Sequence, residues 1–185
     1  MKLFNISWNS SQRSAITVSS LTAFIGPFLI SGVNIALPAI ESEFGLNAVA
    51  LSWVVTSYLL ASAVFLMIIG RYADIKGQIS VFKTGIIIFT IATTLCGIAQ
   101  NGGQLIAMRV LQGIGASMTI TTGAPILVSI FPPAERGKVL GINVASVYLG
   151  LSLGPFIGGI LTQHFGWRSI FLICIPIGII TALLI

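Results

Sequence analysis

Residues 138 to 162 read KVLGINVASVYLGLSLGPFIGGILT, and the only charged residue in this stretch is Lys138, at its first position. A helix needs roughly 20 mainly apolar residues to cross a hydrocarbon core about 30 Å thick, because each residue advances the helix by about 1.5 Å. The stretch is long enough and apolar enough to do so. It therefore predicts a transmembrane helix, and similar stretches occur on both sides of it.

The whole chain has the composition of a membrane protein. Hydrophobic residues make up 56% of it and charged residues 7%, against about 25% charged residues in soluble domains. Helices satisfy their own backbone hydrogen bonds away from water. We expect an all-α membrane protein, with a polar cytoplasmic segment at 1–14 and a six-helix transmembrane domain at 15–185. The predicted spans cover about residues 15–38, 49–70, 80–99, 104–130, 138–162 and 168–185.

The positive charges lie mainly on one side of the predicted domain. Seven fall in the N-terminal segment and in the connections after the second and fourth spans: Lys2, Arg13, Arg71, Lys76, Lys83, Arg136 and Lys138. The alternate connections hold Glu41, Glu43 and one base, Arg168. Cytoplasmic loops carry the excess of Lys and Arg, so we expect a multi-pass protein of the cell membrane with a cytoplasmic N-terminus. The charge is sparse and confined to loops, and no nucleic-acid partner is expected.

The connection after the second span contains two glycines, Gly70 and Gly77, with Asp74 between them. Glycines allow the backbones of a tight turn to approach closely, so we expect such a turn here. Asp74 is placed to cap the next helix or to pair with a base. A solvated turn in which Asp74 only caps the next helix is the alternative.

Arg109 stands about five residues, or ~8 Å, inside the outer end of the fourth span. An arginine within a membrane costs about 2.5 kcal/mol or more and usually faces the bundle interior or a watery cavity. Gln112 and Gly113 follow on the same helix face. The sequence predicts a buried charge that bonds to backbone or to a proton-carrying partner. Extension of the side chain to the nearby outer interface is the alternative.

The fifth span carries a stripe of glycines, Gly150, Gly154 and Gly158, four residues apart. Stripes of small residues let helix backbones pack closely in membranes. Generic helix packing is the alternative to a specific role. Pro155 bends this helix, and Gly26-Pro27 is a second breaker in the first span, which we expect to end at Asn34 to Pro38. Bent helices near the midplane are typical of transporter sites.

No catalytic or metal-binding set of residues is visible. The chain has one histidine, His164, in a predicted connection, and its two cysteines, Cys96 and Cys174, lie far apart in apolar runs. No nucleophile stands with a base. We expect neither an enzyme nor a cofactor.

Taken together, these segments resemble the major facilitator superfamily, and specifically its multidrug:proton antiporters with fourteen spans. Gly70 to Gly77 resembles the helix 2–3 loop motif, and Leu105 to Ala116 resembles the helix 4 motif. Gly150 to Leu161, with Pro155 and Gly159, resembles the helix 5 antiporter motif, the most specific of these. Further resemblance is found in Asn34 to Pro38, Trp53 to Tyr58, Phe131 to Gly137 and Phe165 to Arg168.

The resemblance covers nearly the whole chain but corresponds to the N-terminal half of such a transporter, built from two inverted three-helix repeats. It implies a proton-coupled exporter of drugs or amphipathic metabolites whose two halves rock in the lipid bilayer around a small-molecule substrate. It also implies that Asp74 latches the halves on the cytoplasmic side and that Arg109 takes part in proton coupling. The helix 5 glycines are expected to set the packing at the interface between the halves.

Two positions depart from the family pattern. Leu29 stands where the fourteen-span group usually has an aspartate, and Gln78-Ile79-Ser80 stands where basic residues are usual. The predicted spans contain no acid, so a proton-carrying carboxylate must come from a second half or the coupling differs.

The chain stops inside its sixth predicted span, where a terminal carboxylate is costly to bury. We therefore expect truncation before a C-terminal half of six to eight helices, in the same or a separate chain. A nonproductive or split half-transporter is the alternative function, and a membrane-embedded scaffold is a weaker one.

Overall fold

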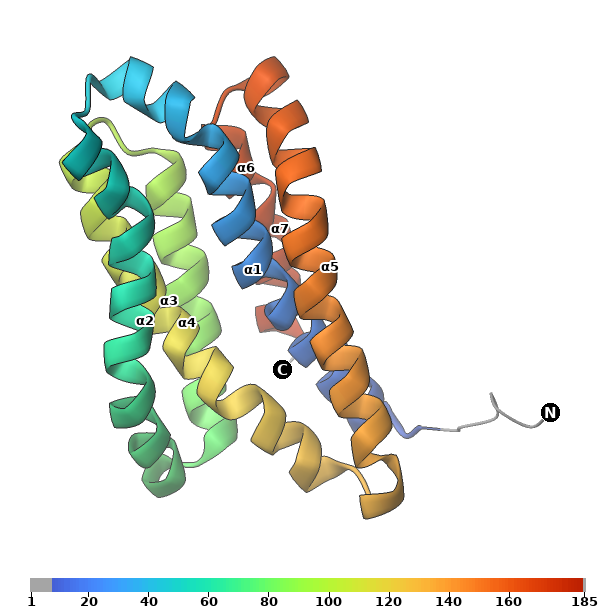
Figure 1. Ribbon diagram of the computed structural model, residues 1–185. Coiled ribbons are helices and arrows are strands. Elements are labelled where there is room, and N and C mark those ends of the chain that lie inside the picture. Colours follow the sequence, from blue (N-terminus) through green and yellow to red (C-terminus); the bar gives the residue numbers. More distant parts are fainter. Residues whose placement is uncertain (1–7, 185) are drawn as a thin grey trace.

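The structure, a computed structural model, describes residues 8–184. This part of the chain is a bundle of helices without strands, which confirms the all-α prediction. Residues 1–7 of the predicted N-terminal segment, and Ile185, lie outside the described residues. In chain order the helices are α1 (Ser10–Phe44), α2 (Ala48–Lys76), α3 (Gln78–Gly97), α4 (Gly102–Ile130), α5 (Pro133–Phe165), α6 (Arg168–Leu172) and α7 (Cys174–Leu183) (Figure 1).

The helices pair in a pattern that repeats within the bundle. α1 lies along α5, while α4 lies against both α2 and α3 (Figure 1). If α6 and α7 are counted together as the sixth helix, then α1, α2 and α3 correspond to α4, α5 and the sixth helix. The α1–α5 pair then corresponds to the α4–α2 pair. Two inverted three-helix repeats produce matched pairs of this kind.

The outside of the bundle is largely apolar. Met67 and Ile68 on α2, Phe156 on α5 and Leu183 on α7 are each more than half exposed. Such large apolar faces are rare on soluble monomers and are solvated by lipid instead. Helices α1 to α5 are each long and apolar enough to cross a membrane, by length and composition.

The sequence suggested that the first helix ends between Asn34 and Pro38, but it does not. It continues to Phe44 and ends at Gly45, whose φ of 62° lies in the left-handed region and whose N–H donates to the Glu41 carbonyl at 2.8 Å. Pro38 removes only the bond to the carbonyl of Asn34, four residues earlier, and Asn34 is exposed. The helix therefore tolerates the proline at this position.

The sixth predicted span is a shorter, interrupted segment, Arg168–Leu183. Its helix is divided at Ile173 into α6 and α7. Pro176 lies four residues after Leu172 and has no N–H to donate to the Leu172 carbonyl. The proline accounts for the break, which a hydropathy pattern does not record.

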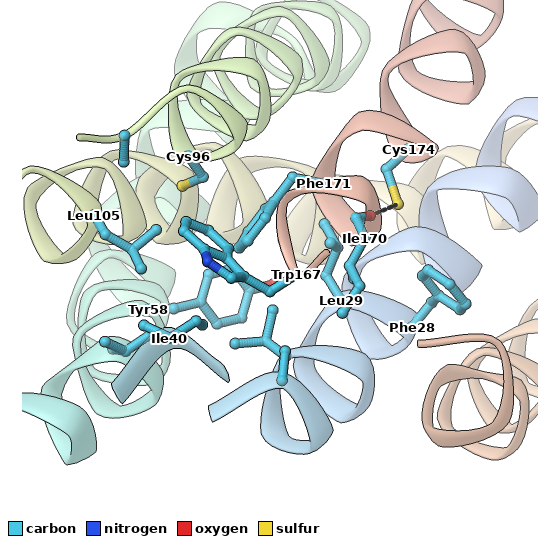
Figure 2. Close-up of a cluster of buried hydrophobic side chains, with 14 of the residues drawn as sticks. Phe28, Leu29, Ile40, Tyr58, Cys96, Leu105, Trp167, Ile170, Phe171 and Cys174 are labelled. Atoms are coloured by element: carbon cyan, nitrogen blue, oxygen red, sulfur yellow. Dashed lines mark hydrogen bonds between the residues drawn. The ribbon is translucent and has the colours of Figure 1, made fainter. Parts of the chain in front are cut away.

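A large apolar cluster fills the bundle near the connection between α5 and α6. In Figure 2 the ring of Trp167 lies beside Phe171, with a centroid distance of 6.1 Å, and Tyr58 and Leu29 belong to the same cluster. Leu29 is 1% exposed. The position where the family pattern has an acid is thus packed among apolar side chains.

Candidate functional site

Arg109 projects from α4 into the bundle and is fully buried. Its Nε donates to the Val54 carbonyl on α2 at 3.0 Å, and its Nη1 donates to Oε1 of Gln112 at 2.6 Å. Gln112 donates to the Thr93 hydroxyl on α3 at 2.7 Å, and Thr93 donates to the Phe89 carbonyl at 2.7 Å. The guanidinium bonds inside the bundle and not at its outer interface. It joins three helices through one chain of hydrogen bonds.

The charge of Arg109 has no carboxylate partner within the described residues. Its Cζ lies 4.4 Å from the centre of the Tyr58 ring, and its Nη2 is buried without a hydrogen-bond partner. Carbonyl oxygens and an aromatic face offset part of the cost of burying the cation. All four acidic side chains lie near helix ends: Glu41, Glu43, Asp74 and Glu135.

Gly113 lies one turn after Arg109 on the same face of α4. A Cβ at this glycine would lie 2.8 Å from Cβ of Ala61 and 3.1 Å from the backbone nitrogen of Ser62, both on α2. Real Cβ atoms essentially never lie within 3.0 Å of another heavy atom, so the contact with Ala61 shows that the glycine is needed for the close packing of α4 on α2. That packing keeps the Val54 carbonyl within reach of Arg109.

The loop between α2 and α3 is smaller than the sequence predicted. Gly70 lies within α2, which continues to Lys76. Of these two glycines, only Gly77 has a backbone suited to glycine, with a φ of 91°. The Gly77 N–H donates to the Ala73 carbonyl at 2.9 Å and closes the helix. Asp74 is exposed in the last turn of α2 and does not cap α3, which has no side-chain cap. The expected capping role of Asp74 is therefore wrong.

The three glycines of the α5 stripe all face α1. A Cβ at Gly150 would meet the Phe24 carbonyl oxygen, and one at Gly158 would lie 2.9 Å from Cα of Gly32. A Cβ at Gly154 would meet the Ser31 hydroxyl and would lie 2.7 Å from the Phe28 carbonyl oxygen. The stripe thus packs two helices of this bundle together. A role at an interface between two halves stays a prediction.

The remaining candidate residues take no part in the close packing of Gly113 on α2 or of the α5 glycine stripe on α1. Asn34 and Pro38 are exposed on α1, and Pro155 is exposed on α5. A Cβ at Gly159 would make only ordinary contact with Ile35, at 3.8 Å. The other candidates lie in three separate places: the Arg109 network, the loop at Asp74, and the close α1–α5 contact.

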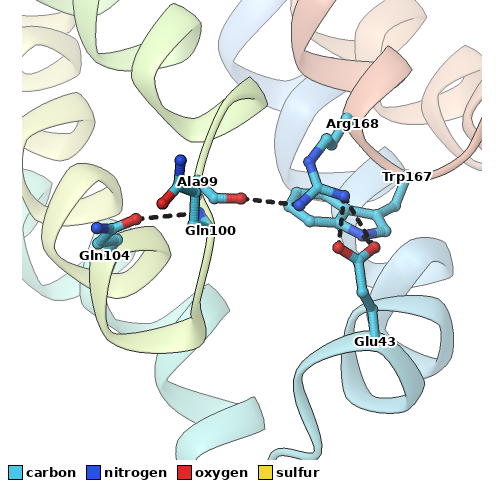
Figure 3. Close-up of polar contacts among 6 residues, drawn as sticks. All are labelled: Glu43, Ala99, Gln100, Gln104, Trp167 and Arg168. Atoms are coloured by element: carbon cyan, nitrogen blue, oxygen red, sulfur yellow. Dashed lines mark hydrogen bonds and ion pairs between the residues drawn. The ribbon is translucent and has the colours of Figure 1, made fainter.

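A polar cluster of Glu43, Trp167 and Arg168 joins three connections at the end of the bundle opposite the α2–α3 loop (Figure 3). The sequence interpretation missed this cluster. Arg168 pairs with Glu43 at 2.6 Å and donates to the Ala99 carbonyl at 2.8 Å, while Trp167 Nε1 donates to Glu43 at 2.7 Å. Glu43 lies beyond the apolar part of α1, and the hydrogen bonds from Arg168 and Trp167 lower the pKa of its carboxyl. The lone base Arg168, on the same predicted side as Glu43, was the available signal for this pair.

A cavity of about 320 Å³ is the other feature that sequence patterns did not indicate. It lies inside the bundle, with walls mainly from α1, α3 and α4 and smaller parts from α2, α5 and α7. Tyr58 belongs to its wall and also carries the Arg109 guanidinium over its ring. The cavity and the Arg109 network are therefore adjacent.

Comparison with known proteins agrees with this architecture. Residues 19–185 match the family model of the Major Facilitator Superfamily. The chain is 43% identical over 152 residues to riboflavin transporter RibZ of Clostridioides difficile, covering 82% of the chain and 33% of that protein. It is 37% identical over 147 residues to multidrug resistance protein Stp of Mycobacterium tuberculosis, covering 79% and 27%. It is 35% identical over 173 residues to the methylenomycin A resistance protein of Bacillus subtilis, covering 93% and 37%.

The chain spans about a third of the length of these relatives. Its helices, its apolar outside and the family match agree that it is an integral membrane protein. The chain belongs to the major facilitator superfamily.

Proposed function

We propose that the chain forms the N-terminal half of a secondary active transporter that exports drugs or amphipathic metabolites in exchange for protons. The observation that carries this proposal is the buried Arg109, which is held by Val54 and Gln112 and has no carboxylate partner among residues 8–184. A charge held in this way interacts strongly with any charge that appears near it. Protonation or deprotonation of an approaching group is such a change.

Relatives named as a riboflavin transporter and as multidrug resistance proteins support a small-molecule substrate. A C-terminal half of six to eight helices, in the same or a separate chain, completes the transporter, and the two halves rock around a central site. The proton-carrying carboxylate belongs to that second half, because the acids of this chain lie near helix ends. Asp74, with Gly70 and Gly77, gates the cytoplasmic side, and the N-terminus is cytoplasmic.

Substitution of Arg109 tests the coupling role. Arg109→Lys keeps the charge but loses the planar fork that reaches Val54 and Gln112 together, so we expect at least a tenfold loss of proton-driven efflux. Arg109→Ala should lose as much or more. The measurement is efflux of the dye N-phenyl-1-naphthylamine by the transporter, with both halves, in liposomes under an imposed pH gradient.

Arg13→Lys is the matched control, because Arg13 is exposed and should tolerate the change. The amount of inserted protein is measured for every variant. Normal efflux by Arg109→Lys would show that a charge on a long stem suffices, and normal efflux by Arg109→Ala would end the coupling proposal.

A further inference from the structure

The cavity beside Tyr58 has an uncharged lining. Its α3 wall is formed by Phe82, Ile86 and Phe89, and none of its lining residues is acidic or basic. Its volume of about 320 Å³ is at the lower end of the ~300–1,000 Å³ range of small-molecule pockets. Flat aromatic molecules suit such a wall, since their rings pack against phenylalanine and tyrosine rings.

Hydroxyl groups in the cavity wall differ in what they offer a ligand. The Thr90 hydroxyl has no hydrogen-bond partner among the described residues, but it is fully buried and lies against α7, where a Cβ at Gly178 would meet it. The Tyr58 hydroxyl points toward α1, because a Cβ at Gly26 would lie 3.4 Å from it. Thr119 and Thr181, in contrast, donate to carbonyls of their own helices.

The electrostatics of the cavity are set by Arg109. The guanidinium lies 4.4 Å from the Tyr58 ring centre, so a ligand in contact with that ring lies roughly 8 Å from the charge. At an effective dielectric constant of about 20, repulsion at that distance weakens the binding of a cation about 30-fold. No acidic side chain of the lining offsets this repulsion.

We propose that this cavity is a binding site for neutral aromatic or amphipathic molecules and that Arg109, acting through Tyr58, excludes permanent cations. The inference deepens the proposed function by naming the charge class of its substrates. The side chains of Phe82, Ile86 and Phe89 on α3 supply the apolar contact with the ligand.

The test compares two ligands that differ by one methyl group and one charge. These are N,N-dimethyl-1-naphthylamine, which is neutral at pH 7, and N,N,N-trimethyl-1-naphthylammonium. Binding to the 185-residue chain in lipid nanodiscs is measured by equilibrium dialysis, with empty nanodiscs as the blank. We expect the neutral ligand to bind at least 30-fold more tightly. Equal affinities, or tighter binding of the cation, would overturn the proposal.

Variants locate the binding and its selectivity. Ala23→Leu and Ala124→Leu fill the cavity from α1 and α4 and should weaken binding of the neutral ligand at least tenfold. Ala63→Leu, at an exposed position of α2 outside the cavity, is the matched control and should leave binding unchanged. Binding that survives both cavity variants would place the ligand elsewhere and refute the site.

Neutralisation of Arg109 tests the source of the selectivity. Arg109→Met should reduce the preference for the neutral ligand to a few-fold, and an unchanged 30-fold preference would refute the role of this charge. If circular dichroism shows that Arg109→Met is unfolded, the proposal is tested by the relative affinities of the neutral ligand and the cation for the unmodified chain. The assay contains no pH gradient and no second half, so a failure of proton-driven efflux would leave a positive binding result standing.

Discussion

Replacement of Gly154 by alanine should loosen the contact between α1 and α5. The new Cβ would meet the Ser31 hydroxyl and would lie 2.7 Å from the Phe28 carbonyl oxygen, whereas ordinary contact begins at 3.4 Å. The Phe28 oxygen is backbone, so the helices themselves must separate by about 0.7 Å. Such overpacking costs about 1–3 kcal/mol.

Gly159→Ala is a control that isolates this cost. It makes the same chemical change in the same helix, but its Cβ would make only an ordinary contact of 3.8 Å with Ile35. The gain in helix propensity from glycine to alanine is common to both variants and cancels in the comparison. Gly154→Ala should therefore be less stable than Gly159→Ala by about 1–3 kcal/mol.

Unfolding by sodium dodecyl sulfate in mixed micelles measures this difference. Helix content is followed by circular dichroism, and tryptophan fluorescence, to which the buried Trp167 of the main cluster contributes, reports tertiary structure. The Gly154→Ala transition should occur at a lower fraction of dodecyl sulfate. If Gly154→Ala is as stable as Gly159→Ala or more stable, the close α1–α5 contact is not what the glycine provides.

Two further predictions concern the ends of the helices. A membrane-impermeant maleimide applied outside sealed cells should label Gln100→Cys but not Lys76→Cys, because the proposed topology places only position 100 outside. Cys96 and Cys174 are buried and give little background labelling. Labelling at position 76 would reverse the proposed orientation. Glu43→Gln should destabilise the chain by up to about 1 kcal/mol, since the pair with Arg168 is partly exposed, while Glu41→Gln should be neutral. The pKa of Glu43 is lowered on folding, so its contribution is present above the ordinary value of 4.5 and is lost as the pH falls through the folded-state pKa. A stability difference between Glu43→Gln and the unmodified chain that does not shrink as the pH is lowered would contradict this.

The sequence predicted the long helices because burial in lipid requires long apolar runs, and such runs are visible without a structure. Their ends were less predictable, because hydropathy does not register capping. Asn9, Asn47 and Asn101 each cap a helix, with the side-chain oxygen accepting from the backbone N–H three residues later. Asn9 and Gln12 form a full capping box. An asparagine before an apolar run was therefore an available signal for where these helices begin.

The Arg109 network shows where sequence reasoning reaches its limit. The cost of the buried charge and the shared face with Gln112 follow from the position and the helical period alone. The other partners, Val54 and Thr93, belong to helices far away in the chain. Only the packing of α2 and α3 against α4 brings them together. A sequence pattern on one helix cannot identify partners that another helix supplies.

The glycine stripe of α5 also bears on how the proposed transporter moves. Its spacing predicts a close contact of α5 but not the helix that α5 contacts, and the structure identifies that helix as α1. The exposed side chains of α5, including Leu149 and Phe156, lie on the rest of its surface and remain available to lipid or to a second half. If the proposed halves rock as rigid bodies, the α1–α5 contact must persist in every state of the cycle. Gly154→Ala should then reduce the amount of folded protein while the efflux per folded molecule stays normal.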